Sequence, residues 1–226
     1  MLIPLKVDVP VARMPWVNIT LIVLITLVTV AGFVDDGVFL TLSGIELVEA
    51  SPLGGEGYYL KVTTDALPLP ALAVTSSLLH ADLIHLLGNM WFLWVFGNAV
   101  NERFGHFAYP ALYLAAAMAG GLAHYATSGV PVVGASGAIN GIMGAFVMFF
   151  AKNEVVVVWL IYLYPRLGKA PSVWAVAFWV AWDVVMLLAG GDSGVALVAH
   201  LAGFLAGLGI AALCTATGLI MPPEHE

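Results

Sequence analysis

Long apolar stretches separated by short polar ones form the main pattern along this chain. A helix needs about 20 mostly apolar residues to cross the hydrocarbon core of a bilayer. Six segments come close to that length, and we expect each to be a spanning helix: residues 16–34, 83–100, 107–126, 134–151, 172–189 and 195–219. The pattern therefore predicts an all-α membrane protein, folded as a single domain over residues 1–226.

Two further segments do not fit a spanning helix. The apolar run from Val155 to Tyr164 has ten residues, which is too short to cross, and it contains four consecutive valines. We expect residues 155–171 to be an extended or interfacial segment, because β-branched residues favour extended backbone. Residues 35–75 form the one long loop, and a loop of this length usually carries some structure or function.

The first apolar segment follows Lys6 and Arg13, as the apolar part of a signal peptide would. No clear small-x-small cleavage site ends it, and five more apolar segments follow. We therefore expect residues 16–34 to be an uncleaved first helix.

Composition agrees with a membrane location. Hydrophobic residues make up 62% of the chain and charged residues 9%, and the mean hydropathy is +1.00. An average soluble domain has about 25% charged residues, so the composition indicates an integral membrane protein. The chain has seven Lys and Arg residues and a net charge of −7, which argues against a nucleic-acid partner. The lone Cys214 cannot form an internal disulfide, and we interpret it as a small buried hydrophobe.

The basic residues predict the orientation in the membrane. Six helices place both termini on one side, and six of the seven basic residues would lie there: Lys6, Arg13, Arg103, Lys152, Arg166 and Lys169. Only Lys61 would lie on the other side, together with most of the carboxylates. Because basic residues are enriched in cytoplasmic loops, we expect a multi-pass protein with cytoplasmic termini.

Four polar side chains converge on one layer of this bundle. His85 and Asn89 fall in the first two turns of their helix, Ser136 in the first turn of another, and His200 about one and a half turns into the last. At 1.5 Å per residue all four lie within roughly 10 Å of the outer boundary. Polar groups inside a membrane are costly, so their convergence indicates a functional cavity.

Ser136 and His200 are the candidate catalytic pair. A serine hydroxyl becomes a nucleophile when a base lies within hydrogen-bond reach, so the pair suggests a hydrolase with its active site inside the membrane. Taken alone, Ser136 could be a small packing residue and His200 could bond a carbonyl group. Glycines that let the two helices approach closely favour the pair: Gly137, Gly141 and Gly144 on one helix, Gly203 and Gly207 on the other.

Other polar residues have candidate roles around this pair. His85 and Asn89 are four residues apart, so they share one helix face, where they fit an oxyanion hole. His80 and His85 are five apart and no glutamate or cysteine completes a ligand set, so we expect no metal site. Asp183 is the only carboxylate in a predicted spanning segment. It could orient His200, although lining a wet cavity or bonding another neighbour is the favoured interpretation.

Three strings in this chain resemble the motifs of the rhomboid intramembrane serine proteases. Residues 80–89 (HADLIHLLGN) match the spacing HxxxxHxxxN, residues 134–137 (GASG) resemble GxSG, and residues 199–207 (AHLAGFLAG) resemble AHxxGxxxG. Their order and helix placement match too, so the resemblance covers nearly the whole chain. It implies a six-transmembrane-helix rhomboid-like bundle, an outward-opening aqueous cavity, and no cofactor or metal.

The resemblance also implies a role for each motif residue. Ser136 is then the nucleophile and His200 the general base and acid. His85, Asn89 and the Ser136 backbone N–H form the oxyanion hole, and His80 is a structural residue near the first loop. The motif glycines are structural residues beside the site: Gly134, Gly137, Gly203 and Gly207. Two features depart from the family: residues 35–75 lack the Trp-Arg loop motif of some members, and Asp183 stands where we expect a neutral polar residue.

The expected partners are the lipid bilayer and transmembrane protein substrates, in the membrane of a prokaryotic cell. A substrate segment should carry small or helix-breaking residues near its outer end, because helical backbone is shielded by its own hydrogen bonds. It would arrive laterally, past the fifth helix or past the loop of residues 35–75. Candidates for a gate or a cavity wall are Phe178, Trp179, Trp182 and Asp183, with interfacial or lipid-facing aromatics as an equal alternative for the first three.

Two other classes of protein compete with a protease. An inactive rhomboid-like protein would only bind transmembrane clients, but Ser136 and His200 are both present here. A small transporter could use intramembrane histidines as a proton relay. No inverted repeat is evident in the sequence, which counts against a transporter.

Overall fold

The structure is a computed structural model that describes residues 2–49, 58–62, 67–161, 164–189 and 196–220. Its elements follow in this order: β1 (Leu2–Val7), α1 (Trp16–Val34), α2 (Asp36–Ser43), β2 (Ile45–Glu49), β3 (Tyr58–Val62), α3 (Leu69–Thr75), the 3₁₀ turn η1 (Ser76–Leu78), α4 (Leu83–Ser128), α5 (Ser136–Phe150), β4 (Glu154–Ile161), β5 (Tyr164–Pro171), α6 (Ser172–Leu188) and α7 (Leu197–Ala216). Residues 50–57 and 63–66 of the predicted loop, and the first residue of the predicted segment 195–219, lie outside the described residues.

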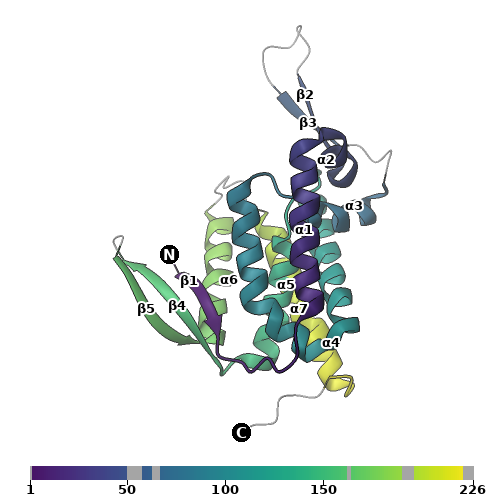
Figure 1. Cartoon of the computed structure of the whole chain (residues 1–226). Helices are drawn as coiled ribbons and strands as arrows, with labels where there is room; N and C mark the ends of the chain where they lie inside the picture. Colours follow the sequence, from purple (N-terminus) through teal and green to yellow (C-terminus); the bar gives the residue numbers. More distant parts are fainter. Residues whose placement is uncertain (1, 50–57, 63–66, 162–163, 190–195, 221–226) are drawn as a thin grey trace.

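Helix α5 lies in the interior of the helical bundle, packed against α4 and α7 (Figure 1). Most of its side chains are buried, and they are small or apolar. Phe146 packs edge-to-face on Phe96 of α4, with ring centroids 5.0 Å apart. Ile142 of α5 and Tyr109 of α4 are among the largest fully buried side chains. A helix that is apolar on all sides is typical of a core, so α5 is the element on which the others are positioned.

Helix α4 is one element by hydrogen bonding but bends sharply at Gly105. This glycine has φ 74° and ψ 173°, which is not helical. A straight helix of 46 residues would be about 70 Å long, more than twice the thickness of a hydrocarbon core. The break divides it into two helical parts at the place where the predicted segments 83–100 and 107–126 are separated. In Figure 1 the two parts are separate teal columns.

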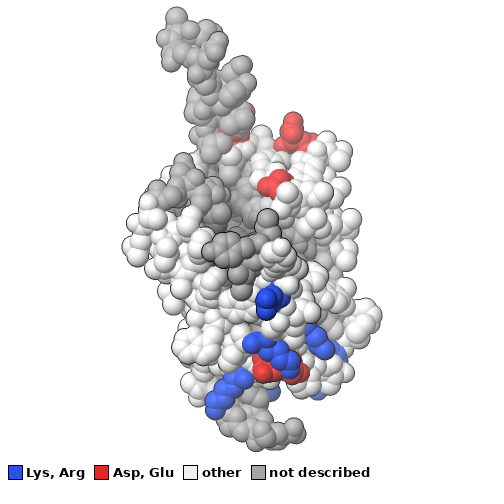
Figure 2. Space-filling model, turned by 90° about the vertical axis from the view of Figure 1, so that its left-hand side faces the viewer, with Lys and Arg blue, Asp and Glu red and all other residues white. Residues whose placement is uncertain are grey.

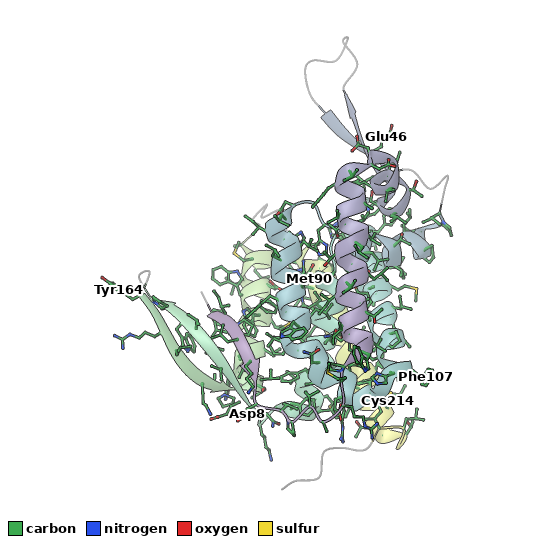
Figure 3. All side chains as sticks on the ribbon, viewed as in Figure 1. Asp8, Glu46, Met90, Phe107, Tyr164 and Cys214 are labelled. Carbon is green, nitrogen blue, oxygen red and sulfur yellow. The ribbon has the colours of Figure 1, made fainter. Side chains whose placement is uncertain are left out.

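Large apolar side chains are exposed on the outside of the bundle. Phe107 is 97% exposed, Val34 85% and Ile84 84%. Figure 3 shows Phe107 pointing away from the helices, whereas Met90 lies among them. An exposed apolar surface of this extent marks a surface that meets a membrane or a partner. Within the described chain, α1, α4 and α7 are long and apolar enough to cross a membrane, while α5 and α6 are shorter apolar helices.

The all-α prediction was wrong in that the described chain also contains β-strands. The extended structure expected within residues 155–171 is confirmed by β4 and β5, which pair as an antiparallel hairpin, and β1 joins them to give the strand order β1-β4-β5. Residues 162–163 of that segment lie outside the described residues. The valines of β4 suit this ladder because β-branched side chains favour extended backbone. Strands β2 and β3 form a second antiparallel pair within the predicted loop of residues 35–75.

Two indole N–H groups hold strand β1 against the helices. Trp91 of α4 donates to the Pro4 carbonyl at 2.6 Å, and Trp179 of α6 donates to the Leu2 carbonyl at 3.2 Å. The Leu2 side chain is itself buried. Strand β1 therefore bridges α4 and α6, two helices that both reach the cavity described below.

A buried polar cluster ties α1 to both parts of α4. The Asn18 side chain of α1 is fully buried and donates to Asn98 Oδ1 at 2.8 Å and to the Leu93 carbonyl at 3.0 Å. Tyr109, which follows the bend in α4, donates to Asn18 Oδ1 at 2.5 Å. Buried amide groups are costly unless they are bonded, so these partners fix the position of α1 on α4.

Charged side chains are distributed unevenly between the two ends of the molecule. Figure 2 shows Lys and Arg toward the lower end of one face and carboxylates at the upper end, with acidic groups also beside the basic ones. Lys169 and Glu154 form an ion pair of 2.7 Å between β5 and β4. The start of α1 and the end of α7 lie at this lower end (Figure 1).

Candidate active site

Ser136 is the first residue of α5 and directly follows a turn that requires glycine. Gly134 has a φ of +132°, a backbone conformation that L side chains rarely adopt. A Cβ at this position would also lie 2.9 Å from Cε1 of His85. The Gly134 N–H donates to the Ser76 carbonyl at 3.1 Å. The turn thus holds Ser136 at the start of the helix, close to the His85 ring.

His80 is fully buried and anchors the same turn. Its Nε2 accepts the Ala135 N–H at 3.4 Å, and its Nδ1 lies 3.1 Å from Thr29 Oγ1. Because Thr29 donates its own proton to the Leu78 carbonyl, these partners assign the ring proton of neutral His80 to Nδ1. Burial lowers the pKa of His80 to about 4, and neighbouring His85 adds to this shift. His80 is therefore neutral at pH 7, with both ring nitrogens bonded.

Glycines bring α5 and α7 into backbone contact. A Cβ on Gly203 of α7 would lie 2.0 Å from the Gly137 carbonyl oxygen of α5. Gly207 meets Gly141 in the same way one turn further along, at 1.8 Å. No side chain fits between the helices at these positions, which is the close approach that the glycine spacing predicts.

Ser136 and His200 line one cavity of about 670 Å³. Its wall is formed by side chains of α4, α5, α6 and α7, which meet here from distant parts of the sequence. Both side chains are partly exposed. In the described part of the chain no hydrogen bond joins Ser136 Oγ to His200, but such bonds are often long before a substrate binds.

His85 and Asn89 lie on one face of α4 and also line the cavity. The buried Asn89 side chain donates through Nδ2 to the His85 carbonyl at 3.1 Å, which leaves its second N–H for another acceptor. The His85 ring packs edge-on against His80, with ring centroids 5.1 Å apart. Asp82 caps the start of α4 by accepting the His85 backbone N–H at 2.8 Å.

Asp183 of α6 both lines the cavity and bonds to His200. Its Oδ2 lies 2.9 Å from His200 Nδ1, and the two side chains are 15% and 12% exposed. Trp179, one turn earlier on α6, also lines the cavity. Phe178 and Trp182 do not, and they are 40% and 57% exposed. Of the four candidates for a gate or wall, Trp179 and Asp183 thus lie in the wall.

Asn140 also lines the cavity and was missed by sequence reasoning. Its Nδ2 donates to the Ser136 carbonyl at 3.0 Å. Asn140 follows Ser136 by four residues, so the two lie on the same face of the helix, and this spacing could have identified Asn140 as a cavity residue. Its second N–H adds an amide donor to the cavity wall.

The groups that the cavity offers are a serine hydroxyl, imidazole rings, amide donors and a carboxylate. This set suits acyl transfer by a nucleophile that a neighbouring base activates. Among the residues that the structure describes, no group of three or more His, Cys, Asp or Glu side chains is arranged to hold a metal ion.

Comparison with known proteins decides the family. The model of the Rhomboid domain family matches residues 71–217, which is more than half of the chain. The chain belongs to the rhomboid family. The matched region contains the turn before Ser136, both glycine contacts and every cavity residue described above.

Named relatives of this rhomboid include proteases. Rhomboid protease GluP of Bacillus subtilis (strain 168) is 38% identical over 81 residues, which cover 36% of this chain and 16% of the relative. RHOMBOID-like protein 6, mitochondrial, of Arabidopsis thaliana is 30% identical over 154 residues, covering 67% and 44%. Putative rhomboid protease YdcA of Bacillus subtilis (strain 168) is 28% identical over 144 residues, covering 62% and 65%. The chain therefore spans less than two thirds of the length of each of these relatives.

Family membership and the apolar helices together identify an integral membrane protein.

Proposed function

We propose that this rhomboid is an intramembrane serine endopeptidase that cleaves transmembrane segments of other membrane proteins. The observation that carries the proposal is that Ser136 and His200 line one cavity, on two helices in backbone contact. The relatives named as rhomboid proteases support the same class of reaction.

In the proposed reaction His200 is the general base and then the general acid. Its Nε2 takes the Ser136 hydroxyl proton as Oγ attacks the peptide carbonyl carbon. His85, Asn89 and the Ser136 backbone N–H hold the oxyanion of the tetrahedral intermediate. His200 then gives the proton to the leaving amine, and water hydrolyses the acyl-enzyme by the same route.

In the membrane we assign six spans, formed by α1, the two parts of α4, α5, α6 and α7. The distribution of the basic residues supports cytoplasmic termini, an orientation in which the cavity would open toward the outer face. A substrate segment must unwind there, because a helical backbone is protected by its own hydrogen bonds. Substrates with small or helix-breaking residues near their outer end meet this requirement.

Labelling with a fluorophosphonate probe tests the proposal. The probe should modify the native protein in detergent, and Ser136→Ala should abolish the modification. His200→Ala should slow it strongly, because the base that activates the serine is lost. Equal labelling of native protein and Ser136→Ala would contradict the proposal. A native protein that binds a transmembrane peptide but takes no label would instead be a non-catalytic binder.

A further inference from the structure

We infer that Asp183 positions His200, so that the catalytic unit of this protein is a serine–histidine–aspartate triad rather than a dyad. The inference rests on the proposed function and adds a residue to it. The observation behind it is the 2.9 Å bond between Asp183 Oδ2 and His200 Nδ1, made across α6 and α7.

The chemistry of the two partners determines which ring nitrogen is free. An ionised carboxylate can only accept hydrogen bonds, so His200 Nδ1 must carry the proton of the bond to Asp183. The neutral ring then has an unprotonated Nε2, which is the form that can take the Ser136 proton. Without this partner, nothing in the bond pattern of the described residues selects that tautomer.

No other carboxylate of the cavity is available for this role. Two carboxylates line the wall, Asp82 and Asp183. Asp82 is occupied at the start of α4, where it accepts the His85 backbone N–H at 2.8 Å. A carboxylate within a spanning helix is costly and normally faces a polar partner. Asp183 satisfies this rule through His200, and both side chains are largely withdrawn from solvent.

The bond can act at each proton transfer. When Ser136 Oγ forms its bond to the carbonyl carbon, its proton moves to His200 Nε2 and the ring becomes a cation. The Nδ1 proton stays in the bond to Asp183, which remains ionised and stabilises that cation. The Nε2 proton then passes to the leaving amine. Asp183 touches neither substrate nor the reacting atoms, so it is a positioning residue.

A merely structural role is the competing explanation. The buried residues of α6 are Ser172, Ala175 and Val176, all near its start. Among the described residues, no other side-chain hydrogen bond joins α6 to α7. The bond could therefore serve only to hold the second half of α6 in place. A test must read the reactivity of Ser136 without requiring a large substrate to pass α6.

The rate of Ser136 labelling by a small fluorophosphonate provides that readout. Asp183→Asn keeps the shape of the side chain but removes its charge, and its amide can also donate, which favours the wrong ring tautomer. We expect labelling of the folded variant to slow on the order of 100-fold. In peptide cleavage kcat should fall by a similar factor with KM little changed.

Two further variants separate an effect of the Asp183 carboxylate from an effect of α6 packing. Val176→Ala loosens the buried start of α6 without touching the bond, and it should label at the native rate. Asp183→Ala should label slowly and recover when formate is added, because formate can occupy the vacated space as a carboxylate. This second variant also decides the matter should Asp183→Asn fail to fold.

Three results would overturn the inference. One is a labelling rate in folded Asp183→Asn that falls by less than tenfold. Another is an Asp183→Ala variant that labels at the native rate, or whose labelling rate does not rise when formate is added. The third is an equal loss in Val176→Ala, which would show that α6 acts only through packing. If the native protein itself takes no label, the proposed function fails and the triad fails with it. Native labelling without an effect at Asp183 refutes the triad alone.

Discussion

Replacing Gly203 by Ala tests the backbone contact that brings the two catalytic helices together. The added Cβ would lie 2.0 Å from the Gly137 carbonyl oxygen and 2.8 Å from its carbon. Ordinary van der Waals contact begins at 3.4 Å, so the backbones must move apart by roughly 1 Å at this point. The Gly137 atoms that the added Cβ would meet belong to the main chain and not to a flexible side chain, so neither helix can yield locally.

The size of the effect follows from two opposing terms. Overpacking costs about 1–3 kcal/mol, and a rigid backbone contact belongs at the upper end of that range. Alanine recovers about 1 kcal/mol through its better helix propensity, which leaves a net loss of about 2 kcal/mol. A displacement of about 1 Å between nucleophile and base costs on the order of 100-fold in rate.

Gly209→Ala is the matched control for this prediction. Gly209 lies on the same helix α7, and a Cβ there would meet nothing within 4 Å. It should gain the helix propensity without the clash, and so melt at or above the native temperature with native activity. Melting in detergent and the rate of Ser136 labelling measure both effects. If Gly203→Ala melted and reacted like Gly209→Ala, the proposed geometry of the site would be wrong.

Three other perturbations test the oxyanion hole, the buried His80 and the attachment of strand β1. Asn89→Ala should lower kcat about 10–1000-fold with little change in KM, because its donor acts on charge that develops in the transition state; a change in KM alone, in steady-state cleavage assays, would make Asn89 a binding residue. The free energy of unfolding should fall as the pH drops from about 6.5 toward 4. Histidine in the unfolded chain has a pKa of about 6.5, whereas the pKa of folded His80 is about 4, so in this range protons bind to the unfolded chain and favour it. The loss of stability should reach about 3 kcal/mol. In melting curves taken across this pH range, the stability of His80→Gln should depend less on pH than that of the native protein; an equal pH dependence in the two proteins would refute the role of His80. Trp91→Phe removes the 2.6 Å bond to the Pro4 carbonyl and should cost about 1 kcal/mol; faster hydrogen exchange in β1 would report it, and unchanged exchange would contradict it.

The helices and the cavity residues could be predicted because their signals are local in the sequence. Apolar length marks a spanning helix, and His85 and Asn89 share a face because they are four residues apart. The glycines of α5 and α7 signal close packing by their spacing alone. Each of these inferences needs only the geometry of one helix at a time.

The remaining features depend on contacts between distant segments. Strand β1 pairs with β4, whose residues come about 150 positions later, and the sequence of residues 2–7 does not indicate which strand they pair with. Asn18 lies near the start of a predicted helix, where a polar residue needs no buried partner, yet it bonds to both parts of α4. The depth of Asp183 could be estimated from its helix, but its bond to His200 depends on the rotation of α6 against α7.

Cleavage of a transmembrane substrate in proteoliposomes is the decisive test of whether this protein is an intramembrane endopeptidase that uses Ser136. The native protein and Ser136→Ala are reconstituted with a single-span substrate that carries helix-breaking residues near its outer end, and products are mapped by mass spectrometry. We expect a single cut near that end by the native protein, and none by a Ser136→Ala variant that melts normally in detergent. Cleavage by Ser136→Ala at the native rate would contradict the role of Ser136 as the nucleophile. An intact substrate in the presence of native protein that takes up the fluorophosphonate label would contradict the endopeptidase activity.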